Sequence, residues 1–236
     1  MGSGRRLAAL KNSCVRYSGC NMSPGCRLYY ITDRTAFPGD EPSRRQRLLA
    51  KIEEAARADI DYIQLREKDL PSRDLESLAQ RAVCIIREAK TLTRLLINSR
   101  TDIALATGAD GVHLRSDDIS PASARSIAQS ATRNPQHESR SFLVAVSCHS
   151  TEEISRAESA GADFAVFAPV FEKFAANPAG LIGLRDTCKI KFPVFALGGV
   201  SLSNAQACLD AGAAGIAGIR LFQENDVADV VRRFRT

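Results

Sequence analysis

Two groups of charged residues in this sequence have the types and spacing needed to hold a polyphosphate. Gln64, Arg66 and Lys68 follow one short apolar run, and Asp117 and Asp118 follow another. Lysine and arginine side chains neutralise phosphate oxygens, whereas carboxylate oxygens are the ligands that Mg²⁺ prefers. Together the two groups predict a site for a diphosphate bridged by Mg²⁺, with Asp117 and Asp118 as the metal ligands. The alternative for each residue taken alone is an ordinary surface ion pair.

A glycine pair and a further arginine indicate a second phosphate-binding group. Leu197-Gly198-Gly199-Val200 ends an apolar run and precedes a stretch with helical pattern that Ser203 is placed to cap, and Arg220 follows the next apolar run. Glycines leave backbone N–H groups accessible, and the start of a helix favours an anion. We expect Gly198, Gly199 and Arg220 to bind a phosphate group. A tight turn without a ligand is the alternative for the glycine pair.

The residues around a third apolar run are candidates for proton transfer or nucleophilic attack. His149 lies beside Ser147 and Ser150, and histidine has an ordinary pKa close to neutrality, so we expect His149 to act as an acid/base. His113 lies inside another apolar run, where a hydrogen bond to a neighbouring loop is the structural alternative. Cys148 is a minor candidate for a nucleophile.

The elements that must position these residues follow a regular alternation. From Arg27 onward, short apolar runs alternate with longer stretches of helical pattern, which is typical of βα units in a parallel sheet. Eight runs are nearly all apolar, as strands covered on both faces must be. The predicted helices include 43–57, 72–90 and 151–159, the last with a capping box of Ser150 and Glu153. The predicted strands are 28–31, 62–65, 95–97, 111–114, 143–146, 164–167, 194–197 and 215–219.

Eight such units predict a single-domain (β/α)₈ TIM barrel over residues 27–236. A phrase of the type Gly-Ala-Asp-Gly, found at Gly108 and echoed at Gly161 and Gly212, precedes several strands and fits a repeated helix end. The competing layout is an open doubly wound sheet, which favours a glycine-rich turn after its first strand. Thr32-Asp33-Arg34 is no such turn. In a barrel, residues that follow the strands share one mouth, so the candidate residues above are expected to converge there.

Composition excludes several classes of protein. The 236 residues are 44% hydrophobic and carry a net charge of +5 without interleaved aromatic residues, so disorder and nucleic-acid binding are not expected. Residues 1–26 are rich in serine, glycine and basic residues, and we expect them to form a disordered N-terminal extension. No apolar stretch is long enough for a signal peptide or a membrane span. Seven cysteines without a CxxC motif predict a reduced, cytoplasmic protein.

Several motifs, taken in their order along the chain, resemble the thiamine phosphate synthase family, which includes the related thiazole tautomerases. The resemblance implies a (β/α)₈ barrel that joins hydroxymethylpyrimidine diphosphate to thiazole phosphate and releases diphosphate. It also implies Mg²⁺ dependence and, usually, a homo-oligomeric assembly. The motifs are TyrIleThrAsp at Tyr30, IleGlnLeuArgGluLys at Ile63, LeuIleAsn at Leu96, GlyAlaAspGlyValHisLeu at Gly108, ValSerCysHisSer at Val146, AlaProValPhe at Ala168 and LeuGlyGlyVal at Leu197.

The same resemblance implies roles for individual positions. Gln64, Arg66 and Lys68 would hold the pyrimidine diphosphate, Asn98 the pyrimidine, Asp118 the Mg²⁺ ion, Ser147 the diphosphate and Gly199 the thiazole phosphate. With the residues singled out above, the expected catalytic set is Arg66, Lys68, Ser147 and His149. The expected substrate-binding set is Gln64, Asn98, His113, Lys173, Gly198, Gly199 and Arg220.

The sequence also departs from the family pattern. Where the synthases usually have Asn-Asp, with the aspartate on Mg²⁺, this chain has Asn98-Ser99, and where they have Leu-Gly-Gln it has Leu114-Arg115-Ser116. A loop containing Thr-Lys is replaced by GluLysPheAlaAlaAsnPro, in which Lys173 is the available substitute. These departures leave two alternatives to a synthase. One is a metal-independent thiazole tautomerase that uses His149, and the other is a non-catalytic barrel that binds a thiamine precursor.

Overall fold

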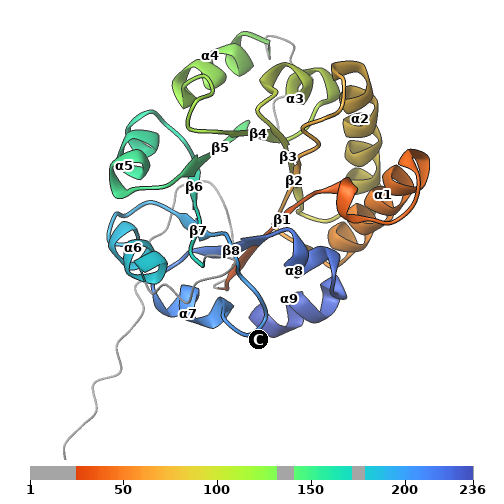
Figure 1. Cartoon of the computed structure of the whole chain (residues 1–236). Coiled ribbons are helices and arrows are strands. Elements are labelled where there is room, and N and C mark those ends of the chain that lie inside the picture. The colour runs from red at the N-terminus through yellow and green to blue at the C-terminus, as the bar shows by residue number, and fades with distance from the viewer. Residues whose placement is uncertain (1–24, 132–140, 172–178, 236) are drawn as a thin grey trace, which may run out of the picture.

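The computed structural model describes residues 25–131, 141–171 and 179–235. Eight parallel strands form a closed barrel in which each strand pairs with the next and β8 pairs with β1, and helices surround it (Figure 1). The predicted (β/α)₈ fold is therefore confirmed, and the open doubly wound sheet is excluded. Of the predicted N-terminal extension, residues 1–24 lie outside the described part of the chain.

The strands agree with the predicted runs to within two residues at each end. The main differences are at carboxyl ends, where Asn98, Ser147 and Cys148 belong to strands although they were expected just after them. A strand continues as long as its backbone pairs, so a polar side chain does not end it. The strands are β1 (Arg27–Ile31), β2 (Tyr62–Leu65), β3 (Arg94–Asn98), β4 (Gly111–Leu114), β5 (Leu143–Cys148), β6 (Phe164–Phe167), β7 (Val194–Ala196) and β8 (Gly215–Gly218).

Of the two predicted N-terminal caps, the one at Ser150 is present and the one at Ser203 is not. At α5, Ser150 Oγ accepts the Glu153 amide at 3.2 Å, as predicted, whereas the Glu153 carboxylate binds the His149 amide. The predicted cap at Ser203 is wrong, because α7 starts one residue later and follows Asn204. The helical segments are η1 (Arg34–Ala36), α1 (Glu41–Arg57), α2 (Ser72–Ala89), α3 (Thr101–Thr107), α4 (Pro121–Ala131), α5 (Thr151–Ser159), α6 (Ala179–Thr187), α7 (Ala205–Asp210), α8 (Arg220–Gln223) and α9 (Val227–Arg235).

The barrel interior is filled by an aromatic layer. Along β1, Leu28 and Tyr30 pack among the residues of the helices, whereas Tyr29 and Ile31 belong to the inner cluster. Ring centroids in this layer lie 4.9 to 6.1 Å apart, mostly in edge or tilted geometry, which aromatic rings prefer. The barrel interior beneath the mouth is thus filled by packed side chains. The four rings are Tyr29, Tyr62, Phe164 and Phe195.

The described part of the chain contains no helix long and apolar enough to cross a membrane. Its five cysteines, Cys26, Cys84, Cys148, Cys188 and Cys208, are free thiols.

Replacing Phe164 with alanine is expected to destabilise the barrel by about 3–5 kcal/mol, because the ring is fully buried and its loss leaves a cavity in the aromatic layer. The free energy of unfolding from urea titration measures the effect. Leu92→Ala is the matched control, since Leu92 is 70% exposed and its truncation should change stability by less than about 0.5 kcal/mol. Equal effects of the two substitutions would contradict the packing described here.

Candidate functional site

Charged side chains from the loops after β2 and β4 converge at the carboxyl ends of the strands. The pKa of Lys68 is lowered first by the nearby charge of Arg66, then by partial burial and by Arg115. His113, on β4, is near enough to Arg66 and Asp118 for both charges to influence its pKa. Such mutual effects require proximity. The structure therefore brings Arg66, Lys68, Arg115 and Asp118 to one mouth, where Arg66 and Lys68 have the charge to attract a polyanion.

The loop that carries Arg66 and Lys68 is anchored from below by a buried carboxylate. Glu67 is 4% exposed and accepts hydrogen bonds from Thr32 Oγ1 at 2.6 Å and from Arg34 Nη1 at 3.1 Å. Burial raises the pKa of Glu67, and the bonds from Thr32 and Arg34 oppose that rise by favouring the charged form. Thr32 Oγ1 also accepts the Arg66 amide at 2.9 Å. The backbone at Arg66 is thereby fixed to Thr32, the residue that follows β1.

A single guanidinium group holds the loop on both sides of Lys68. Arg34 is 3% exposed and binds Asp69 through two bonds of 2.7 Å, in addition to its contact with Glu67. A bidentate arginine–carboxylate pair restricts orientation as well as position. Because Glu67 and Asp69 flank Lys68, their common partner Arg34 limits where the Lys68 amine can lie. Arg34 and Thr32 thus position the cations of the mouth.

Beneath the mouth, four polar side chains form a continuous file of hydrogen bonds. Gln64 Nε2 donates to the Tyr29 hydroxyl at 3.2 Å, the hydroxyl lies 3.0 Å from His113 Nδ1, and His113 Nε2 lies 2.8 Å from Ser147 Oγ. Gln64, Tyr29 and His113 are at most 3% exposed, whereas Ser147 is half-buried. Gln64 and His113 thus lie under the mouth and bind neighbouring side chains, and their contact with substrate stays a prediction.

His113 is kept neutral by its surroundings. Burial, and then the charge of Arg66, lower its pKa to about 3. A neutral imidazole carries one N–H, so one ring nitrogen donates and the other accepts.

The acid pair lies against an arginine of its own loop. The Arg115 guanidinium binds Asp117 Oδ2 at 2.8 Å and lies 3.7 Å from Asp118 Oδ1, and the Arg115 amide donates to Asp118 Oδ2 at 2.7 Å. On neighbouring β3, Asn98 Nδ2 donates to Ser99 Oγ at 3.1 Å, where a second acidic ligand was expected from the resemblance. Both carboxylates of the loop already have a cationic partner.

These donors do not fit a Mg²⁺ site made by the protein. Within the described ranges, no group of three or more histidine, cysteine, aspartate or glutamate side chains is arranged to hold a metal ion. Mg²⁺ requires oxygen ligands in octahedral geometry, and a guanidinium beside the carboxylates competes for the same oxygens. The predicted metal role of Asp117 and Asp118 is therefore not supported by the donor set.

His149 lies exposed at the carboxyl end of the barrel, with its Nδ1 2.5 Å from the carbonyl oxygen of Ala168. A carbonyl only accepts, so Nδ1 carries the proton and Nε2 is the nitrogen that remains for a ligand. Cys148 differs: it is 1% exposed, and burial raises its pKa to about 12. The thiol is protonated at neutral pH, so the predicted nucleophile at Cys148 is wrong.

The glycine pair after β7 is required by close packing. Gly198 and Gly199 have φ angles of 94° and 63°, and an added Cβ would lie 2.7 Å from Pro169 Cα and 2.6 Å from the Phe171 carbonyl oxygen, respectively. No larger residue fits there without movement of the backbone. The nearby helices α7 and α8 have six and four residues, so they are short for anion binding, and Arg220 is exposed at the start of α8.

Two further cations follow strands in the sequence, Arg100 and Lys173. The Arg100 guanidinium binds both oxygens of Asp102, at 2.9 and 2.6 Å, and Ser72 Oγ at 2.8 Å, so its charge is already paired. Lys173 lies outside the described residues.

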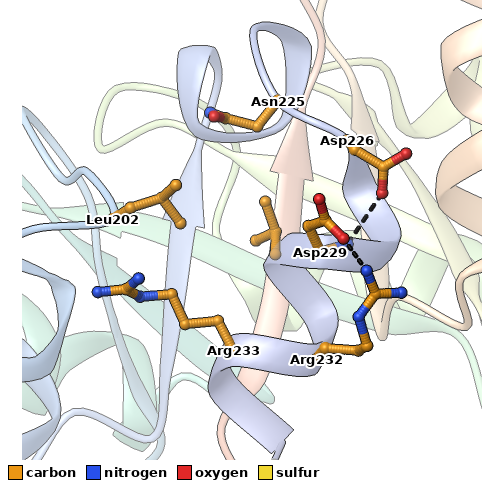
Figure 2. Close-up of a pocket in the computed structure, with 7 residues that line it drawn as sticks. Leu202, Asn225, Asp226, Asp229, Arg232 and Arg233 are labelled. Carbon is orange, nitrogen blue, oxygen red and sulfur yellow. Dashed lines mark hydrogen bonds and ion pairs between the residues drawn. The ribbon is translucent and has the colours of Figure 1, made fainter.

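The described residues also form two concave regions away from this mouth. Figure 2 shows a cavity of about 310 Å³ where Leu202 faces α9, with Arg232 and Arg233 in its wall. A larger one, of about 1070 Å³, lies at the opposite end of the barrel beside Leu92, Asp110 and the start of β5. Neither is lined by a residue of the predicted site, so the chemistry of the side chains, rather than cavity size, locates the candidate site.

Sequence reasoning missed Tyr29, Thr32 and Arg34. Tyr29 is part of an apolar run and has the pattern of core, whereas Thr32 belongs to the TyrIleThrAsp motif and, with Arg34, to a turn without glycines, with no role given to either. One signal was available: Glu67 stands between two cations directly after a buried strand, and a carboxylate buried there requires partners.

The comparisons with known proteins agree with this picture. A model of the family described as thiamine monophosphate synthase matches residues 28–222. A putative thiamine-phosphate synthase of Geobacter sulfurreducens is 42% identical over 200 residues, covering 80% of this chain and 83% of that protein. The thiamine-phosphate synthase of Methanospirillum hungatei JF-1 is 37% identical over 219 residues, covering 89% and 96%. A solved thiamine phosphate pyrophosphorylase from Pyrococcus furiosus superposes with a TM-score of 0.70 at 31% identity, covering 88% of this chain and 92% of that one.

Stability is expected to fall as pH decreases from about 6.5 toward about 3 because of His113. The folded state resists protonation of this residue, whereas the unfolded state accepts the proton below its ordinary pKa. The contribution of His113 is therefore complete above that pKa and is lost at up to about 1.4 kcal/mol per pH unit below it. Urea unfolding at pH 7, 6, 5 and 4 measures the slope. His113→Gln should flatten it, and parallel curves for the two proteins would contradict the assignment.

Metal binding by the protein alone is expected to be weak because the Arg115 guanidinium competes with the metal for the carboxylates. The double variant S99D/R115Q adds a carboxylate and removes the competing guanidinium, so its affinity for Mn²⁺, used as a probe for Mg²⁺, should rise about tenfold or more. Calorimetry without substrate measures this. Arg57→Gln, at a guanidinium in an exposed helical pair with Glu53, is the control and should change nothing. Tight binding by the unmodified protein would refute the expectation.

Proposed function

Because the chain belongs to the thiamine monophosphate synthase family, we propose that it couples hydroxymethylpyrimidine diphosphate to thiazole phosphate and releases diphosphate. It is thus a transferase of thiamine biosynthesis that acts on small phosphorylated substrates. The observation that carries the proposal is the convergence of Arg66 and Lys68 at one mouth, with Arg66 close to His113, which contacts the half-buried Ser147.

In the proposed reaction, the bond between the pyrimidine methylene carbon and the diphosphate oxygen breaks, and diphosphate leaves with the electron pair. The thiazole nitrogen then donates its lone pair to that carbon and forms the new carbon–nitrogen bond. Negative charge grows on the leaving oxygen, so Arg66 and Lys68 act by stabilising it. Fixed charges of this kind lower the barrier because they need no reorganisation during the reaction.

Positioning accounts for the rest of the catalytic effect. Arg34 and Thr32 hold the loop of the two cations before substrate arrives, so little loop entropy is lost on binding. We assign the pyrimidine to the vicinity of Asn98, at the end of β3, and the thiazole phosphate to Gly198, Gly199 and Arg220. The carboxylates of the β4 loop are partnered by Arg115 and do not fit a protein-bound metal, so no step is assigned to Mg²⁺.

One observation favours a second candidate, a metal-independent thiazole tautomerase. His149 keeps Nε2 available because Nδ1 is bound to Ala168, and this is the geometry that an acid/base requires. Ser99 and Arg115 also remove features that only a metal-dependent synthase needs. Arg66 and Lys68 support the synthase, since a tautomerase handles no diphosphate.

The deciding experiment supplies both substrates with Mg²⁺ and measures thiamine phosphate and released diphosphate. The unmodified protein should form both, and Lys68→Ala should reduce the rate by about 10²–10³-fold, the effect of removing one group that stabilises charge in the transition state. Lys189→Ala is the matched control, because Lys189 is a 73% exposed lysine paired with Asp186. His149→Gln should retain most of the coupling. Failure to couple, combined with His149-dependent isomerisation of the thiazole phosphate, would replace the synthase by the tautomerase.

A further inference from the structure

The file of hydrogen bonds beneath the mouth has a direction set by its first member. It joins four strands, from Gln64 on β2 through Tyr29 on β1 and His113 on β4 to Ser147 on β5. The amide nitrogen Nε2 of Gln64 has protons and no accepting lone pair, so it donates to the Tyr29 oxygen. Tyr29 is fully buried, and its own proton must therefore find an acceptor within the protein.

That acceptor is His113 Nδ1, the other partner recorded for the Tyr29 hydroxyl. With Nδ1 accepting, the single proton of the neutral imidazole is on Nε2, which then donates to Ser147 Oγ. In the opposite tautomer, Nδ1–H and the Gln64 amide would both donate to Tyr29, and the buried Tyr29 proton would be left without an acceptor among the described residues. The burial of Tyr29 makes that arrangement unfavourable.

The surroundings of His113 keep this arrangement of protons unchanged at neutral pH. His113 remains neutral because it is buried and because the Arg66 guanidinium lies nearby. Asp118, the other charged group near the ring, has its carboxylate engaged by Arg115. The ring also packs against the Tyr29 ring, with the two centroids 5.8 Å apart.

We propose that Tyr29 and His113 are positioning residues that turn the hydroxyl proton of Ser147 into the mouth, which makes Ser147 a hydrogen-bond donor to an anionic oxygen. The direction of the file follows from the side chains alone, and the identity of the anion, a diphosphate, rests on the proposed function. A serine whose oxygen already accepts from His113 is biased toward fully ionised oxygens, which can only accept, and against hydroxyl groups that need an acceptor.

The first test reads the tautomer directly. Nitrogen-15 NMR of the full chain labelled at histidine distinguishes Nε2–H from Nδ1–H, and the His113→Gln variant identifies the signals of His113. The unmodified protein should show the Nε2–H form, and Tyr29→Phe should give a mixture of both forms. Tyr30→Phe is the matched control, because the buried Tyr30 hydroxyl on the opposite face of β1 has no hydrogen-bond partner in the described structure. An Nδ1–H form in the unmodified protein would overturn the proposal.

The second test measures binding of inorganic pyrophosphate by calorimetry. Ser147→Ala and Tyr29→Phe should each weaken binding about ten- to a hundredfold, the effect of one hydrogen bond to a charged group. The double variant should be no weaker than Ser147→Ala, since Tyr29 acts through Ser147. Tyr30→Phe should bind as the unmodified protein does. Additive losses, or no loss in Tyr29→Phe, would overturn the proposal, as would an unmodified protein that does not bind pyrophosphate.

The two proposals fail separately. If thiamine phosphate does not form but the tautomer and the coupled pyrophosphate binding are as expected, the synthase proposal fails and the role of Tyr29 and His113 stands. If coupling occurs and Tyr29→Phe changes neither the tautomer nor pyrophosphate binding, only the role of these two residues is refuted.

Discussion

The pairing of β1 with β8 closes the barrel, and the arrangement of the site depends on that closure. In a closed ring of parallel strands, every carboxyl end is at the same side, so side chains that are distant in sequence are forced to share one mouth (Figure 1). Arg66 follows β2 and Asp118 follows β4, yet both influence His113. Without closure, the loops at the two edges of a sheet would lie far apart, and no common charged surface would form.

Closure of the barrel brings several cations together at the mouth, and the bonds between Arg34 and the carboxylates of the β2 loop offset the repulsion between these cations. Arg66, Lys68 and Arg115 repel one another when no anion is bound, and the lowered pKa of Lys68 reflects this. The loop keeps its conformation because Arg34 binds carboxylates on both sides of Lys68. Arg34 and Glu67 are both buried, and loss of one member of that pair costs about 3–5 kcal/mol, since the other charge is left without a partner. The bonds of Arg34 thus stabilise the loop directly beneath the cations, which repel one another until a ligand binds.

The interior of the barrel combines apolar packing with one polar path. Most of the inner layer is aromatic or aliphatic, and a polar group there must be satisfied by the protein. Gln64, Tyr29 and His113 satisfy each other and reach the surface only through Ser147. Gln64 and His113, predicted to bind substrate, are therefore also buried supports for the mouth. Tyr29 lies deeper in the barrel and reaches Ser147 through His113.

The sequence by itself determined the fold class, the eight strands to within two residues at each end, and the place of Arg66, Lys68 and Asp118 after their strands. These depend on local pattern: an apolar run indicates a strand, and the residue type that follows it is visible in the chain. Only the tertiary structure decided that Arg34 anchors the loop after β2, that Arg115 pairs with the acidic residues, and that Gln64 and His113 lie beneath the surface. Hydrogen bonds such as Thr32 to Glu67 or Tyr29 to His113 join residues 35 and 84 positions apart. Their geometry is set by strand register and burial, and neither can be read from the local order of residues.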